Sequence, residues 1–195
     1  FWLMAAKHAW KGMGEDPRRG IASARIVLES ACTANPNSEA IWLAGVKLEW
    51  ESDEILRARA LLSKARVAAP SSRVWMKSML LEREQGDVET VLKFAEEGMK
   101  VYPKAHKLYL IAGQTCEHDQ NDTRKAMAYY LRGTQHCPEC APLWIHFASS
   151  EENLGLTSKA RATLETARVR MRDLQNEDSL WLASSRLERR TGNLE

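Results

Sequence analysis

Two cysteines and two histidines lie close together in the segment HCPECAPLWIH, residues 136–146. Cys137 and Cys140 form a Cys-x-x-Cys pair, and His136 and His146 flank it. Thiolates and imidazoles at such spacing can bind zinc or form a redox-active dithiol. No second Cys-x-x-Cys or spaced His pair completes a set of four ligands, so the sequence favours a turn in which the thiols happen to be close. We expect no metal site.

The segment GMGEDPRRG, residues 12–20, has the glycines of a candidate nucleotide-binding loop. It lacks a third glycine at dinucleotide-binding spacing, follows an expected helix instead of a strand, and has no Gly-Lys-Ser or Gly-Lys-Thr. We interpret it as an inserted connector. No Ser, His and Asp arrangement, paired-carboxylate site or His-Glu-x-x-His segment stands out elsewhere. The sequence therefore predicts a protein that is not an enzyme, with no cofactor and no small-molecule substrate.

Basic side chains gather in SKARATLETARVRMR, residues 158–172, against a single acid, Glu165. A basic helix face can contact RNA, and the sequence offers Arg168, Arg170 and Arg172 as candidate partner-binding residues. No aromatic is interleaved for base stacking. We therefore favour a solvated face or a contact with an acidic protein over RNA.

The bulk composition limits the function classes. The formal net charge is only +2, from 28 basic and 26 acidic residues, so the surface as a whole is not a nucleic-acid-binding one. Any RNA contact would be local and secondary. No apolar run approaches the roughly 20 residues that a membrane span requires, and no membrane partner is expected. Scattered cysteines fit a reducing compartment. Because Phe1 opens inside an apolar periodic segment, we expect a fragment of a longer protein.

An aromatic residue recurs along the chain at intervals of 33 to 40 residues, and we call these residues the anchors. The anchors are Trp2, Trp42, Trp75, Tyr109, Trp144 and Trp181. Seven residues after four of them stands a glutamate, at Glu49, Glu82, Glu151 and Glu188. Eleven residues after an anchor stands Gly86, Gly155, Gly192 or Asp53, types suited to a left-handed turn. A first helix of each unit is therefore predicted to end there.

Small residues recur in the segment that follows, if one inserted residue is allowed in the Tyr109 unit and six in the first unit. The second small position is filled by Ala31, Ala65, Gly98, Gly133 and Ala167. A proline closes four of the units, at Pro36, Pro70, Pro103 and Pro138. Ser38, Asp87 and Thr157 are candidate helix caps. The pattern predicts helical hairpins of about 34 residues.

The size contrast explains why the pattern repeats. An indole buries on the order of 200 Å² between two helices, and a small residue lets the second helix approach closely. One hairpin cannot bury its own apolar face, whereas stacked copies can. We therefore predict an all-α, right-handed superhelix forming a single repeat array, with units near 1–37, 38–71, 72–104, 105–139, 140–177 and 178–195.

The fullest unit contains an aromatic, a Glu seven residues on, an Arg-Ala-Arg second helix and a closing Pro. Its residues are Trp42, Glu49, Arg57, Ala58, Arg59, Ala65 and Pro70. This pattern resembles the HAT (half-a-TPR) repeat over essentially the whole chain. The Trp75 unit departs from it, with VLKFAEEG in the second helix, and the first helix lacks the Glu.

The resemblance to HAT proteins implies a nuclear, non-catalytic scaffold that presents a surface to other proteins in pre-mRNA splicing. It implies bridging of components of the spliceosomal tri-snRNP. The alternatives are a scaffold in cleavage and polyadenylation or in ribosome biogenesis, or a direct RNA-binding solenoid.

Two motif features allow alternative interpretations. We expect Glu49 to pair with Arg57 or Arg59 across its own hairpin, the alternative being display of these charges to a ligand. Trp10 and Trp50 each stand eight residues after an anchor, about 80° around the helix from it. Trp50 is therefore a candidate partner-binding residue in a groove of stacked first helices, the alternative being burial against a neighbouring repeat.

Overall fold

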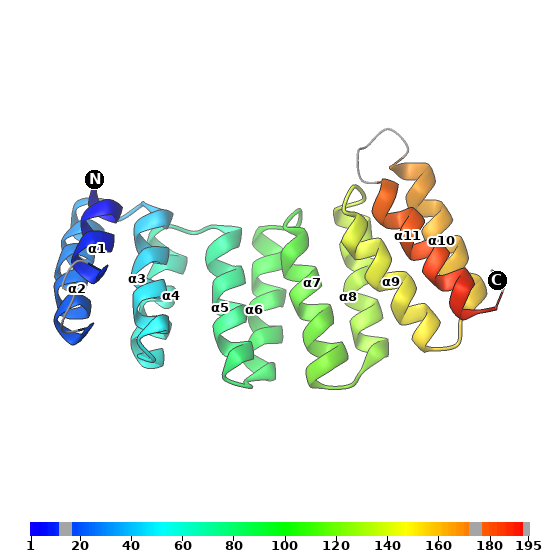
Figure 1. The fold of residues 1–195 in the computed structure, drawn as a ribbon, viewed down its shortest axis with the longest axis horizontal. Helices are drawn as coiled ribbons and strands as arrows, with labels where there is room; N and C mark the ends of the chain where they lie inside the picture. The colour runs from blue at the N-terminus through cyan, green and yellow to red at the C-terminus, as the bar shows by residue number, and fades with distance from the viewer. Residues whose placement is uncertain (12–16, 172–176, 193–195) are drawn as a thin grey trace. The chain divides into compact units, whose positions relative to one another are not determined.

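The computed structural model describes residues 1–11, 17–171 and 177–192, and within these ranges every regular element is helical (Figure 1). The prediction of an all-α fold is confirmed. By their contacts the residues form two compact units, Phe1–Leu81 and Glu82–Glu195, which we describe separately. None of the described helices has the length and apolar character needed to cross a membrane.

The first unit consists of helical hairpins, in which α1 packs against α2 and α3 against α4, while α2 also contacts α3 (Figure 1). Its helices are α1 (Trp2–Lys11), α2 (Pro17–Ala34), α3 (Glu39–Glu51), α4 (Ile55–Ala68) and the larger part of α5 (Ser72–Glu84).

The second unit continues the hairpins, with α7 against α8 and α9 against α10, while α11 contacts both α10 and α9 (Figure 1). Its helices are α6 (Val88–Val101), α7 (His106–Gln114), the π-helix η1 (Thr115–Asp119), α8 (Thr123–His136), α9 (Ala141–Asn153), α10 (Thr157–Arg170) and α11 (Glu177–Arg190).

The turns that end the first helices adopt the predicted left-handed conformation. Gly86, Gly155 and Gly192 have φ of 77°, 75° and 76°, and Asp53 has φ of 60°. An added Cβ on Gly86 or Gly155 would meet nothing within 4 Å, so the backbone angle and not space selects glycine there. The prediction that the helices end at this offset is confirmed.

The extra residue of the Tyr109 unit has a structural counterpart. Residues Thr115–Asp119 form a π-helix directly after α7, and the turn that follows has Asn121 at φ 54°. A π-bulge accommodates one inserted residue inside a helix. The insertion therefore stays within the first helix and leaves the rest of the hairpin in register.

The structure corrects two predicted caps and one connector. Asp87 caps α6 as predicted, its side chain accepting from the Thr90 N–H at 3.0 Å. Ser38 occupies the N-cap position of α3 without a side-chain capping bond, and Thr157 is the first residue of α10, so that it is not the cap. Asp122 caps α8, which the pattern did not predict.

The segment GMGEDPRRG is only partly a connector. Its residues 12–16 lie outside the described part of the chain, but 17–20 form the first turn of α2, where proline is favoured because its missing N–H needs no partner. Gly20 is buried, and a Cβ there would come within 2.6 Å of the Trp10 carbonyl oxygen. Close packing of α2 on α1 therefore requires this glycine.

The anchors and small residues form the interior. Trp42, Tyr109 and Trp144 are 8%, 1% and 6% exposed, and Ala65 and Ala167 are fully buried. Gly98 and Gly133 are buried as well. The Trp42 Nε1–H donates to the Pro36 carbonyl at 2.7 Å, and the Trp144 Nε1–H donates to the Pro138 carbonyl at 2.9 Å. The closing proline of one unit thus accepts a hydrogen bond from the anchor of the next.

Candidate functional site

The motif glutamate pairs with the preceding hairpin, not with its own. Arg25 of α2 donates from Nε and Nη2 to the two carboxylate oxygens of Glu49 on α3, at 2.8 and 2.6 Å. Glu49 is 5% exposed, and this hydrogen bond raises the pKa of Arg25. Our expectation of Arg57 or Arg59 as its partner is wrong for Arg57, which lies 4.0 Å from Glu54. Arg25 belongs to the second helix of one hairpin and Glu49 to the first helix of the next. The ion pair therefore connects two successive hairpins.

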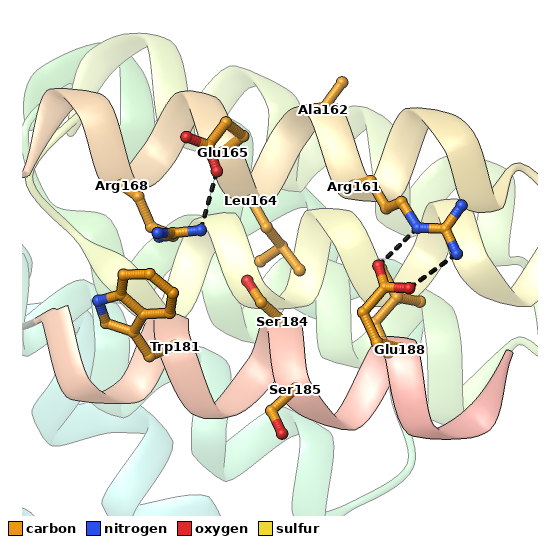
Figure 2. Close-up of a pocket in the computed structure, with 10 residues that line it drawn as sticks. Arg161, Ala162, Leu164, Glu165, Arg168, Trp181, Ser184, Ser185 and Glu188 are labelled. Atoms are coloured by element: carbon orange, nitrogen blue, oxygen red, sulfur yellow. Dashed lines mark hydrogen bonds and ion pairs between the residues drawn. The ribbon is translucent and has the colours of Figure 1, made fainter. Parts of the chain in front are cut away.

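The same ion pair recurs in the second unit (Figure 2). Arg161 of α10 donates from Nε and Nη2 to the carboxylate of Glu188 on α11, at 2.5 and 2.9 Å. Arg25 and Arg161 each follow the first small residue of the second helix, namely Ala24 and Ala160. A planar guanidinium matches a carboxylate in two parallel bonds, which fixes orientation as well as distance. We call these two the inter-repeat ion pairs.

Where the arginine is absent, the glutamate changes its role. Met127 of α8 replaces the arginine, and Glu151 of the next unit, 6% exposed, accepts from the Thr163 hydroxyl within its own hairpin at 2.7 Å. Leu92 of α6 likewise replaces it, and the next unit carries the fully buried Cys116 in place of the glutamate. Comparing each second helix with the unit after it would have revealed this dependence in the sequence.

The basic segment of α10 is engaged by the protein's own aromatic rings. The Arg168 guanidinium lies 3.2 Å from the centroid of the Trp181 ring and donates to Glu165 at 2.8 Å (Figure 2). Arg170 lies 5.4 Å from the centroid of the Trp144 ring. Arg172 lies outside the described residues. Their role in partner binding stays a prediction.

The anchors are not equally buried. Trp181 is 52% exposed, and Trp2 and Trp75 are only partly buried. In the part of the chain that the structure describes, α11 contacts α10 and α9, and no second helix covers the outer side of Trp181. Trp181 is therefore the most exposed of the six anchors.

The cysteines of HCPECAPLWIH lie on the turn between α8 and α9. Cys137 is the C-cap of α8 and Cys140 is the N-cap of α9, and both are free thiols. Burial raises the pKa of each thiol, which disfavours the reactive thiolate. In residues 1–11, 17–171 and 177–192 no group of three or more His, Cys, Asp or Glu is placed to hold a metal ion.

Trp50 is partly buried in the core and partly exposed in a groove, so both environments that the sequence allowed are present. One part of the side chain packs against the core cluster that contains Trp42 and Leu62. The other part lines a groove on the first helices of the first unit, where Lys77 of α5 lies 5.7 Å from the ring centroid. Trp50 is therefore accessible enough to contact a partner, and that role stays a prediction.

The fold defines the class of protein, a TPR-like helical-repeat protein. Solved structures agree. PilW, a widely conserved type IV pilus biogenesis factor, matches with a TM-score of 0.59 at 18% identity, covering 99% of this chain and 87% of PilW. The MamA protein matches with a TM-score of 0.60 at 14% identity, covering 88% of this chain and 90% of MamA. At such identities the likeness concerns the fold alone.

The sequence relatives are splicing factors. Over 147 residues, 75% of this chain, it is 38% identical to pre-mRNA-splicing factor prp1 of Schizosaccharomyces pombe. Over 129 residues, 64% of this chain, it is 30% identical to pre-mRNA-splicing factor 6 of Saccharomyces cerevisiae. The chain spans 16% and 14% of the lengths of these relatives. No protein-family model matches. The chain is thus a helical-repeat homologue of pre-mRNA-splicing factors, and the resemblance to HAT repeats is confirmed.

Proposed function

We propose that this chain is a non-catalytic scaffold in pre-mRNA splicing, which presents helical-repeat surfaces to other proteins in the nucleus. We further propose that it bridges components of the spliceosomal tri-snRNP, as the sequence resemblance to pre-mRNA-processing factor 6 implies. The observation that carries this proposal is the 38% identity to splicing factor prp1 over 147 residues of a repeat array.

The physical basis of a scaffold is fixed spacing between surfaces. The inter-repeat ion pairs and the Trp–Pro hydrogen bonds each connect one hairpin to the next. They restrain the angle between neighbouring hairpins, so that partners bound to neighbouring repeats stay at a defined separation. Holding two partners on one chain raises the effective concentration of each for the other.

The proposal is tested by immobilising the chain in nuclear extract and identifying the retained proteins and RNAs. We expect proteins of the tri-snRNP, and retention should survive nuclease treatment. A Trp42→Ala variant, whose hairpin we expect to be destabilised, is the control for retention that does not depend on the packed array. Retention of polyadenylation or ribosome-assembly factors instead, or retention that nuclease abolishes, would contradict the proposal.

A further inference from the structure

The Cys-x-x-Cys pair lies in one tight turn between α8 and α9. The Cys140 N–H donates to the Cys137 carbonyl at 3.1 Å, which closes a β-turn around Pro138 and Glu139. The Cα atoms at the two ends of such a turn lie less than about 7 Å apart. Disulfides span Cα separations of about 4.4–6.8 Å. The backbone therefore places the two cysteines at a separation that a disulfide can bridge.

The turn itself does not explain a cysteine at each end. The same turn closes two other units, where the Ser38 N–H donates to the Asn35 carbonyl at 3.1 Å and the Ala105 N–H donates to the Tyr102 carbonyl at 3.0 Å. Those turns form with no thiol at either end. Cys140 is the N-cap of α9, but it makes no side-chain capping bond, and cysteine is not among the preferred caps. The paired thiols are therefore a feature of this turn that folding does not require.

Both thiols of the pair are accessible from solvent. Cys137 and Cys140 are partly exposed, and both line the same hollow on the surface of the second unit. Cys116 is fully buried in η1, by contrast. Cys32 is partly exposed, but residues 1–81 contain no other cysteine. A small oxidant can therefore reach two neighbouring thiols at this turn.

The surroundings of the pair favour a stable disulfide over a reactive thiolate. Burial, and after it the proximity of Cys140, raises the pKa of the Cys137 thiol, and burial raises the pKa of the Cys140 thiol. Dithiols that act as strong oxidants owe this property to a stabilised reduced form. A raised pKa keeps both thiols protonated, so the reduced pair has no stabilised thiolate to lose. We therefore expect a disulfide that forms slowly and resists reduction.

A metal ion fits this turn less well than a disulfide does. His106 and His136 line the same hollow as the two thiols. The His136 ring, however, stacks on the Tyr109 ring, with 5.9 Å between the centroids. Among the residues whose placement the structure describes, no three His, Cys, Asp or Glu side chains are grouped to hold a metal ion. The chemistry of two thiols is what remains.

We propose that Cys137 and Cys140 are a redox modification site, at which a small disulfide such as glutathione disulfide converts the two thiols into an intramolecular disulfide. The thiolate of one cysteine attacks the small disulfide, which forms a mixed disulfide and releases one small thiolate. The thiolate of the other cysteine then attacks the protein sulfur of the mixed disulfide and releases the second small thiolate. The protein loses two electrons and two protons, and the protons pass to the two released thiolates.

Oxidation changes what the turn is attached to. In the reduced state the Cys137 thiol donates to the Pro103 carbonyl of the preceding closing turn, at 3.8 Å. The disulfide removes this donor and joins the end of α8 to the start of α9. The Pro138 carbonyl inside the turn accepts from the Trp144 Nε1–H at 2.9 Å, so a stiffer turn holds the anchor of the next hairpin more firmly. This inference does not depend on the proposed scaffold function.

The test is equilibration of the folded chain in mixtures of reduced and oxidised glutathione, followed by alkylation and peptide mass spectrometry. We expect the wild type to lose two alkylatable thiols, with Cys137 joined to Cys140, while Cys116 stays reduced. Cys137→Ser and Cys140→Ser should each lose the internal disulfide and stop at the mixed disulfide. Cys32 is the matched control, because it is partly exposed and has no neighbouring cysteine in its unit, so it should form no internal disulfide.

Hydrogen exchange measures the expected stiffening of the turn. The Leu143 N–H donates to the Cys140 carbonyl at 3.1 Å, and this amide should exchange about threefold or more slowly in the oxidised protein. The same treatment of Cys137→Ser should leave its exchange unchanged, and equal rates in the two states of the wild type would contradict the stiffening.

The proposal of a redox site is overturned if both thiols stay alkylatable in the folded chain. It is equally overturned if mixed disulfides persist on both cysteines without an internal bond, or if the internal bond forms only in the denatured chain.

Discussion

The hairpin that carries Trp42 and the helix that carries Trp181 present the same residue types at matching offsets. Within the part of the chain that the structure describes, a second helix that follows in the chain packs on the first of them, α3, but not on α11. In one, Arg25, Leu28, Trp42 and Glu49 line a groove that Leu61 and Lys64 of α4 complete. In the other, the matching residues are Arg161, Leu164, Trp181 and Glu188 (Figure 2), and among the described residues the groove is lined by α10 and α11 alone.

The difference shows in exposure. Trp42 is 8% exposed and Trp181 52%, and the carboxylate of Glu49 is 7% exposed against 28% for Glu188. The anchor's type and position are the same, so its burial is supplied by the helix that follows it. A first helix with its motif residues is therefore not enough to bury its anchor, and the second helix that packs on it is needed as well.

Replacing the enclosed anchor should have the largest effect. Trp42→Ala should lower the free energy of unfolding by about 3–5 kcal/mol, because it leaves a cavity and frees the Pro36 carbonyl. Trp181→Ala should cost at most about 1 kcal/mol, since it loses mainly the stacking with Arg168. Urea denaturation followed by circular dichroism measures both. Equal losses from the two substitutions would show that the exposed side of Trp181 is covered in solution.

Breaking the inter-repeat ion pair beside Trp42 should likewise cost more stability than breaking the one beside Trp181. Glu49→Ala should cost about 2–3 kcal/mol, because it leaves the half-buried Arg25 without its bidentate partner. Glu188→Ala should cost far less, since solvent screens that pair. A double-mutant cycle with Arg25→Ala isolates the coupling in the first unit. A coupling energy near zero would mean that the pair adds nothing to the connection between hairpins.

A larger side chain placed three residues after the anchor should destabilise the Trp42 hairpin more than the Trp181 helix. Gly45 of α3 is buried, and a Cβ there would lie 3.4 Å from Leu61 Cδ1, so Gly45→Leu should overpack the α3–α4 hairpin at a cost of about 1–3 kcal/mol. Ser184 holds the matching position on α11, and Ser184→Leu should stay within about 0.5 kcal/mol of the wild type. Melting temperatures of the two variants decide this. A stable Gly45→Leu protein would mean that α4 can shift away from α3.

The smallest expected effect is a pH dependence of the stability of the α9–α10 hairpin. Burial lowers the pKa of His146 on α9, whose ring stacks on Tyr130 at 5.2 Å and faces Glu117 and His118. A folded-state pKa below the unfolded value of about 6.5 means that stability is present above that pH and is lost as the pH falls through it.

Hydrogen exchange of α9 should therefore become faster below about pH 6.5, relative to α11, which contains no histidine. His146→Gln should reduce this difference. The intrinsic pH dependence of exchange is removed by comparing protection factors. Protection of α9 that stays constant in the wild type down to about pH 5 would contradict the assignment.

Much of the architecture was predictable, because local rules decide it. Left-handed turns select Gly86, Gly155 and Asp53. The large–small alternation of anchors and second-helix positions follows from close packing. The single-residue insertion in the Tyr109 unit was visible as a register shift and became a π-helix. Each of these depends on backbone geometry within one hairpin, which neighbouring residues in the sequence control.

Side-chain contacts between helices were less predictable. From its position seven residues after the anchor, Glu49 could pair with an arginine of its own unit or of the preceding unit. Only the packing of α3 against α2 makes Arg25 its partner. Gly113 gave no turn signal inside a helix, yet a Cβ there would come within 2.6 Å of Tyr130 Cζ. The glycine is required because the Tyr130 ring of α8 passes over α7 at that point.

The sequence by itself determined the all-α class, the repeat period, the helix ends and the homology to splicing factors, because periodicity and motif spacing are properties of the chain alone. Tertiary structure decided which arginine meets each glutamate and how far Trp50 and Trp181 are exposed. It also brought Leu3 to the groove that Trp50 and Lys77 line. These features depend on distances between residues separated by one repeat or more, and those distances are set only when the hairpins pack.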